Sequence, residues 1–153
     1  MDTDPKPKIT EFGEQLIAAN DGQETGEVTL EGVTYPYRVC DPAKMKNAPK
    51  LFVGFGTHTG RKELFISSEV DPRFRTYVFL HEVNCLPHVG EPHHCSNAEK
   101  HVLDHVPHPD KLDYIDLRKQ MFENLIVYLS GQKTPPEAFL RETRETLEFL
   151  KTQ

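Results

Sequence analysis

The chain of 153 residues contains 24 Asp and Glu against 18 Lys and Arg, and its formal net charge is -6 at pH 7. This length fits one domain with a core of useful size, so folding should not require a metal or disulfides. A net acidic chain is unsuited to nucleic acid, whose phosphates are bound by clustered Lys and Arg. No apolar run approaches the roughly 20 residues that span a bilayer, and the N-terminus lacks the basic and apolar regions of a signal peptide. We therefore expect a cytoplasmic protein without nucleic-acid or membrane partners.

The N-terminal part of the chain predicts a tail and one helix. Residues 1–7 are polar and include two prolines, which is typical of a loose tail. From Ile9, apolar residues recur at helical spacing as far as Ile17. Asn20-Asp21-Gly22 then supplies a stop, so a short amphipathic helix is expected between these points.

Four short strands are expected next. Residues 27–30 and 33–39 alternate between apolar and polar side chains around Glu31-Gly32, which is the pattern of a hairpin with a tight turn. Pro36 predicts that the second strand lies at a sheet edge or carries a bulge, because proline has no N–H to donate. The other two predicted strands are residues 51–56 and 63–69.

The middle of the chain predicts a largely buried helix. Asp71-Pro72 is a good start, with an N-cap side chain followed by proline at the first helical position, and the helix should cover residues 74–86. Residues 76–79 are also good strand material, so a strand is the alternative there. Ser96-Asn-Ala-Glu99 matches a capping box that opens a second helix as far as about Val106.

Two further helices are expected at the C-terminal end. An apolar stripe extends from Leu112 to Leu129 and ends near Gly131. Thr134-Pro-Pro-Glu137 matches a second capping box, and the charged residues between 141 and 148 should face solvent. The inward side chains of this last helix are expected to be Phe139, Leu140, Leu147 and Leu150.

This order of elements predicts an α+β fold, with a small mixed or antiparallel sheet of about four strands packed on helices. We expect one domain over residues 1–153. It should consist of the tail at 1–7, an α+β core over residues 8–110 and a C-terminal helical pair over residues 111–153.

Three cysteines, an odd number without a regular framework, agree with a reducing compartment. Cys40 has no ligand partner close in sequence and is expected to be a buried free thiol. Cys85 and Cys95 lie among histidines and are candidate metal ligands. A disulfide between them is the alternative in an oxidising environment.

Seven of the eight histidines lie between His81 and His108, and imidazole, thiol and carboxylate groups are the ligands of transition metals. On a helix, positions i and i+4 project from one face, so His81 and Cys85 could bind one ion together. Glu82 could then reach a water on the same metal. This is the arrangement of His-Glu-x-x-His, with cysteine in place of the second histidine, and Glu99 on the next helix is a candidate third ligand.

The segment His81-Glu82-x-x-Cys85, followed by Ala98-Glu99 on a second helix and preceded by the strand at 64–68, resembles a minimal zincin metallopeptidase of the glutamate-ligand branch, the gluzincins. The resemblance covers about residues 27–106 and rests on a few motif residues. It implies a mixed sheet packed on the active helix, a peptide substrate aligned along the edge strand, and a zinc-activated water that attacks the scissile carbonyl. By position, His81 and Glu99 would bind zinc, Glu82 would be the general base, and Cys85 would take the second ligand's place.

The same segment permits other interpretations. Cys85, His88, His94 and Cys95 could form a closed, structural Cys2His2 zinc site without an open position for water. A thiolate at Cys85 favours this alternative, because it donates more charge to zinc than imidazole and so raises the pKa of a bound water. A third interpretation is a non-catalytic module that binds a peptide or protein partner by strand addition beside residues 64–68. The histidines could also simply face solvent, without a metal.

Overall fold

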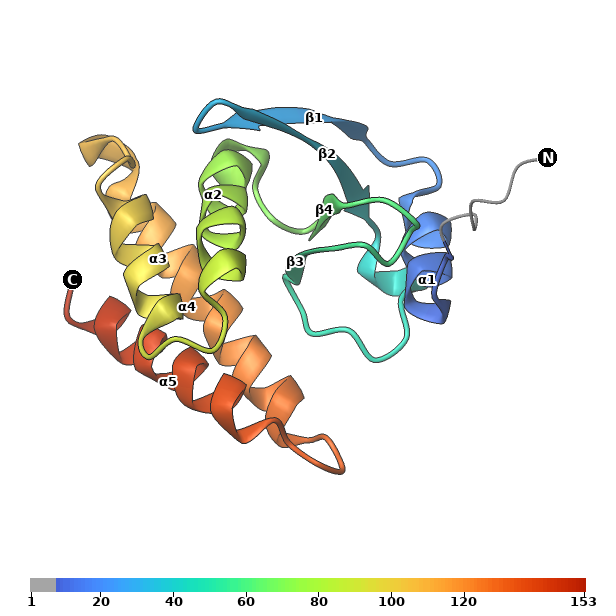
Figure 1. Ribbon diagram of the computed structural model, residues 1–153. Coiled ribbons are helices and arrows are strands. Elements are labelled where there is room, and N and C mark those ends of the chain that lie inside the picture. The colour runs from blue at the N-terminus through green and yellow to red at the C-terminus, as the bar shows by residue number, and fades with distance from the viewer. Residues whose placement is uncertain (1–7) are drawn as a thin grey trace.

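The structure, a computed structural model, describes residues 8–153, so the predicted tail at 1–7 lies outside the described part of the chain. The fold is α+β, as predicted, with a four-stranded sheet and a helical C-terminal part (Figure 1). In chain order the elements are α1 (Glu11–Asn20), β1 (Thr25–Leu30), β2 (Val33–Cys40), β3 (Val53–Gly56), β4 (Glu63–Ser67), α2 (Arg75–Cys85), α3 (His94–Leu103), α4 (His108–Ser130) and α5 (Glu137–Lys151).

The sheet is mixed and has the strand order β1-β2-β4-β3. β1 and β2 form the predicted antiparallel hairpin, β2 and β4 are parallel, and β4 and β3 are antiparallel. Glu31 and Gly32 connect the hairpin with φ angles of 51° and 83°. Two consecutive positive φ angles match the twist of the flanking strands, which explains why this dipeptide forms the turn.

The prediction that Pro36 marks an edge strand or a bulge is wrong, because β2 lies between β1 and β4 and its pairing with β1 is continuous through Pro36. The pairing of β2 with β4 covers only Tyr37 to Cys40, whereas Pro36 pairs with Glu27 of β1. Pro36 therefore precedes the segment whose second edge is hydrogen-bonded. A proline is tolerated there because no partner strand on that side needs its N–H.

The predicted capture of a peptide by strand addition beside residues 64–68 is also wrong. β4 pairs with β2 on one edge and with β3 on the other, so its backbone groups already have partners. All five residues of β4 are buried. The free edges of this sheet belong to β1 and β3.

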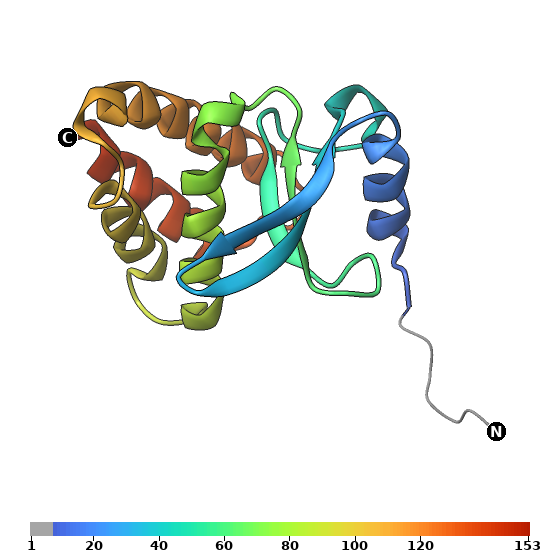
Figure 2. The ribbon, with the colours of Figure 1, turned by 90° about the horizontal axis from the view of Figure 1, so that it is seen from above.

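Helices cover both faces of the sheet (Figures 1 and 2). Leu64 and Ile66 of β4 point toward α2 and belong to the main core, which also includes buried side chains of α3, α4 and α5. Phe65 points the opposite way and packs in a second, smaller core with Leu16 of α1. This alternation follows from the two-residue period of a strand, and it places α2 between the sheet and the C-terminal helices.

Residues 75–85 form a helix rather than a strand. Asp71 accepts a hydrogen bond from the backbone N–H of Arg73, and a 3-10 turn over Pro72–Phe74 leads into α2. Val78 and Phe79 are buried in the main core. The predicted cap at Asp71-Pro72 is thus present but belongs to this 3-10 turn, and α2 itself begins at Arg75 without a side-chain cap.

Both predicted capping boxes are wrong, although the helices are present. α5 begins at Glu137 with Pro136 in the capping position, so Thr134 does not cap it. α3 begins at His94, so Ser96 lies inside it and donates its hydroxyl to the carbonyl of His93. Glu142 of α5 instead accepts from the backbone N–H groups of His93 and Cys95 at 3.4 and 3.5 Å. A carboxylate from another helix therefore satisfies the N-terminal donors that a local cap would satisfy.

The C-terminal helices form the predicted pair, with some differences in which side chains are buried. Leu140 and Leu150 are buried as expected, whereas Phe139 is 44% exposed. Glu142 is buried despite its place in the charged segment that was expected to face solvent. Within residues 8–153, no helix is both long enough and apolar enough to cross a bilayer.

Candidate metal centre

His81, Cys85 and Cys95 come together in the interior and form what we call the His-Cys-Cys group. His81 and Cys85 are one helical turn apart on α2, as the sequence predicts, and Cys95 lies in the first turn of α3. One ligand atom from each side chain lies within 4.8 Å of the other two. His81 and Cys95 are buried and Cys85 is partly buried, so the group is held by the packing of two helices.

The distance between the donor atoms of His81 and Cys95 is compatible with a shared metal ion. Bonds of about 2.1 Å to nitrogen and about 2.3 Å to sulfur that meet at a tetrahedral angle place the two donor atoms about 3.6 Å apart. Nε2 of His81 and Sγ of Cys95 lie 3.6 Å apart. These two atoms form a weak hydrogen bond. The same spacing would accept an ion with little movement of either side chain.

Glu99, expected as a third zinc ligand, lies behind His81 instead. Its Oε1 is 3.5 Å from Nδ1 of His81, on the opposite side of the ring from the nitrogen that approaches Cys95. A carboxylate beside the second ring nitrogen can orient a ligand histidine, although at 3.5 Å Nδ1 of His81 forms no hydrogen bond with Glu99. The structure therefore places Glu99 beside His81, and Cys95 rather than Glu99 lies together with His81 and Cys85.

Glu99 is itself held by two residues of α4. Tyr114 donates its hydroxyl to Oε1 at 2.7 Å, and Arg118 donates Nε to Oε2 at 2.8 Å. The exposed fractions are 0% for Glu99, 0% for Tyr114 and 1% for Arg118. Three polar side chains with almost no access to water are stable only because they are paired with one another.

The charges in this buried cluster shift its ionisation. Burial lowers the pKa of His81, but the Glu99 carboxylate opposes this and raises that pKa to about 10. Burial raises the pKa of Glu99, whereas Arg118 and His81 lower it to about 2. The contact with Cys85 and burial both raise the pKa of Cys95. The charges of Glu99 and Arg118 thus favour each other, and the carboxylate of Glu99 favours the protonated form of His81.

Comparisons of the chain with protein-family models, curated proteins and solved structures find no match. The resemblance to zincins therefore rests on the motif residues alone. What the His-Cys-Cys group can do follows from its own geometry and from the space around it.

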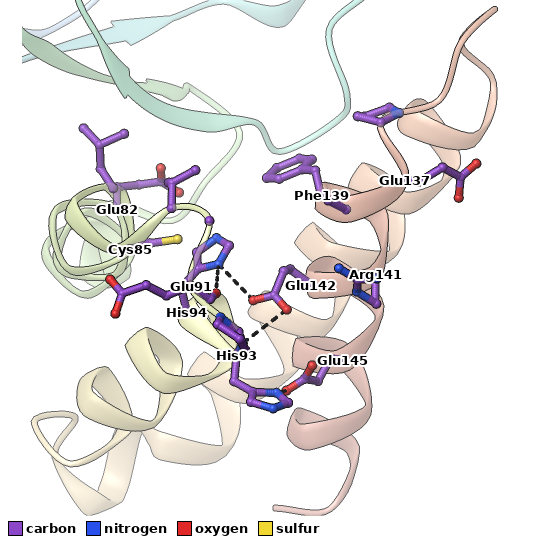
Figure 3. Close-up of a pocket in the computed structure, with 16 residues that line it drawn as sticks. Glu82, Cys85, Glu91, His93, His94, Glu137, Phe139, Arg141, Glu142 and Glu145 are labelled. Carbon is purple, nitrogen blue, oxygen red and sulfur yellow. Dashed lines mark hydrogen bonds and ion pairs between the residues drawn. The ribbon is translucent and has the colours of Figure 1, made fainter.

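A cavity of about 760 Å³ reaches the His-Cys-Cys group through Cys85. Its walls are the end of α2, the loop between α2 and α3, and the first half of α5 (Figure 3). Glu82 lies on the same wall as Cys85, and burial raises the pKa of the Glu82 carboxyl. The predicted general base and one predicted ligand therefore share a cavity large enough for a small ligand.

The residues of the alternative Cys2His2 site do not all come together. His94 is buried and lines the cavity, but its Nδ1 lies 2.9 Å from a carboxylate oxygen of Glu142, and it is not a member of the His-Cys-Cys group. His88 is exposed and pairs with Glu91 through Nδ1 at 2.6 Å.

Cys85 and Cys95 are free thiols rather than a disulfide. Cys40 is a buried free thiol, as predicted.

Sequence reasoning missed Arg118 and Tyr114. A weak indication was present, because Tyr114, Arg118 and Phe122 follow one another at intervals of four and so share one helical face. Both neighbours of Arg118 in this series are aromatic and buried. A charge on the buried face of a helix requires a buried partner of opposite charge, but nothing in the sequence says that the partner is Glu99.

Proposed function

We propose that the protein is a zinc-dependent hydrolase that cleaves peptide bonds at the His-Cys-Cys group. The observation that carries this proposal is the convergence of three soft or borderline metal ligands beside a cavity that also contains Glu82. Three protein ligands are the number found in catalytic zinc sites, where the fourth position is left for water or substrate.

Each residue would have a distinct role. His81, Cys85 and Cys95 would hold the zinc ion, and Glu99 would keep the imidazole of His81 oriented. Zinc, when bound, would supply a Lewis acid for the attacked carbonyl and for water. Glu82 would accept a proton from the attacking water and deliver it to the leaving amine. Cys85 lies on the cavity wall, so a peptide would approach the group from that side.

A second function, a structural zinc site in a non-catalytic peptide-binding protein, is favoured by the two cysteines. Thiolates donate more charge to zinc than imidazole does, which weakens its action as a Lewis acid. The cavity would then bind a partner without cleaving it. The two functions share the ion and differ in whether Glu82 has a chemical role.

Metal analysis tests the shared part of the two functions. Protein purified without added zinc should contain one equivalent of zinc, and Cys95→Ser should lose most of it. Matched serine substitution at Cys40, which is buried but far from this group in the fold, should leave the zinc content unchanged. A metal-free wild-type protein whose folding is unaffected by chelators would exclude both functions.

Cleavage of a complex peptide mixture, with new termini identified by mass spectrometry, separates the two functions. Glu82→Gln should retain zinc and lose cleavage by a factor of about 10² to 10⁴, the usual contribution of a general base. Glu91→Gln makes the same chemical change at an exposed position on the cavity wall and should remain active. Equal cleavage by wild type and Glu82→Gln, or none by zinc-loaded wild type, would refute the hydrolase.

A further inference from the structure

Large apolar side chains are exposed around the mouth of the cavity. Leu86, Val89 and Phe139 are 39%, 63% and 44% exposed, and all three line the cavity. Phe139 projects from α5 on one side of it (Figure 3), while Leu86 and Val89 belong to the loop after α2. Exposed apolar side chains that gather at one concave site are typical of a binding surface.

The lining of the cavity is strongly acidic. It contains five glutamates and a single arginine, Arg141. Three of these glutamates already face a histidine: Glu91 faces His88, Glu142 faces His94, and Glu145 faces His93. The remaining two are Glu82 and Glu137, and within residues 8–153 neither forms an ion pair. Arg141 forms none in that range either, so the unpaired charges of the lining are two carboxylates and one guanidinium.

The two unpaired carboxylates differ in their access to solvent. Glu82 is partly buried on α2, close to Cys85, whereas Glu137 is exposed in the first turn of α5. A ligand in the cavity would therefore meet apolar walls and a lining in which carboxylates outnumber cations, which favours a cationic over an anionic group beside Glu137. The volume of about 760 Å³ suits a short segment of chain rather than a folded domain.

We propose that the cavity binds a short peptide segment in which a bulky apolar residue is adjacent to Lys or Arg. The apolar side chain would pack against Leu86, Val89 and Phe139, and the cation would lie beside Glu137. This inference rests on the proposed function only for the claim that the bound segment is also the one cleaved. Binding itself requires neither zinc chemistry nor turnover.

Three fluorescein-labelled hexapeptides that differ at the central pair test the selectivity by fluorescence anisotropy with zinc-loaded protein. The central pairs are Leu-Lys, Leu-Glu and Ser-Lys in an otherwise identical Gly/Ser sequence. Leu-Lys should bind about 10-fold more tightly than Ser-Lys, which loses the apolar contact. It should bind about 2- to 5-fold more tightly than Leu-Glu, which loses an exposed charge contact. Its advantage over Leu-Glu should shrink between 50 mM and 500 mM salt, because screening weakens the charge contact.

Substitutions on α5 locate the binding surface. Glu137→Lys should abolish or reverse the preference for Leu-Lys over Leu-Glu. Glu148→Lys makes the same change of charge on the same helix, but Glu148 does not line the cavity, and the preference should remain. Phe139→Ser should weaken both leucine peptides about 10-fold and leave Ser-Lys unchanged.

The outcomes separate this inference from the proposed function, because peptide integrity is checked by mass spectrometry in the same samples. Selective binding without cleavage would support the peptide class and refute the hydrolase. Cleavage of all three peptides without a preference among them would support the hydrolase and refute the peptide class. Equal affinities for all three peptides, or equal effects of Glu137→Lys and Glu148→Lys, would overturn the inference. A homodimer that is lost in Phe139→Ser and binds no peptide would assign the apolar mouth to a second copy of the chain and would also overturn it.

Discussion

Removing the guanidinium of Arg118 should destabilise the protein more than most single substitutions. In Arg118→Met the side chain keeps much of its length and apolar character, but the hydrogen bond from Nε to Glu99 at 2.8 Å is lost. Glu99 has no exposed surface through which water could replace it. Leaving one member of a buried pair without its partner costs about 3–5 kcal/mol.

The cost should lie near the lower end of that range. His81 stays 3.5 Å from Glu99 and Tyr114 still donates to it, so the carboxylate keeps part of its compensation. We therefore expect a loss of about 3 kcal/mol. A domain of this size is stable by about 5–15 kcal/mol, so the loss would be a large share of the total.

A double-mutant cycle identifies the cause of this loss. Glu99→Gln alone leaves Arg118 buried and unpaired, and should cost a similar amount. In the double variant both charges are absent, and the amide can still accept from Tyr114. The double variant should therefore be more stable than the sum of the two single losses by about 2 kcal/mol or more.

Urea unfolding followed by circular dichroism provides the free energies, with unchanged m-values as the condition for comparing them. The measurements should be made in chelator and again at one saturating zinc concentration, because a ligand that binds only the folded state adds to its stability. A loss below about 1 kcal/mol in Arg118→Met, or two single losses that simply add, would show that the pair does not hold the cluster together.

Three further predictions concern single positions. Glu99→Gln should lower zinc affinity about 10- to 100-fold in competition with a chromophoric chelator, because the imidazole of His81 loses its orienting carboxylate; a change below 3-fold would contradict this. Burial raises the pKa of Cys40 to about 12, so iodoacetamide at pH 8 should modify Cys40 only after unfolding. Alkylated Cys40 in mass spectra of the native protein would contradict this. Gly13→Ala should cost about 1–3 kcal/mol in urea unfolding, since the added Cβ would lie 1.9 Å from the carbonyl oxygen of His58, whereas Gly131→Ala, with its nearest contact at 3.5 Å, should cost far less.

The sequence predicts the two members of the His-Cys-Cys group that lie on one helix. Asp71 caps the 3-10 turn that leads into α2, and the four-residue interval between His81 and Cys85 then places both on one face. These relations are local, so periodicity and capping chemistry are sufficient to find them. Cys95 could be named as a candidate, but its position depends on how α3 packs against α2.

The exchange of roles between Glu99 and Cys95 could not be predicted, because it is decided by distant residues. Arg118 is 19 positions from Glu99, and its hydrogen bond holds the carboxylate of Glu99 in the core. Glu142 is 47 positions from Cys95 and holds the start of α3 by accepting from its backbone N–H. Each contact joins α3 to a different C-terminal helix, and neither leaves a periodic pattern in the sequence.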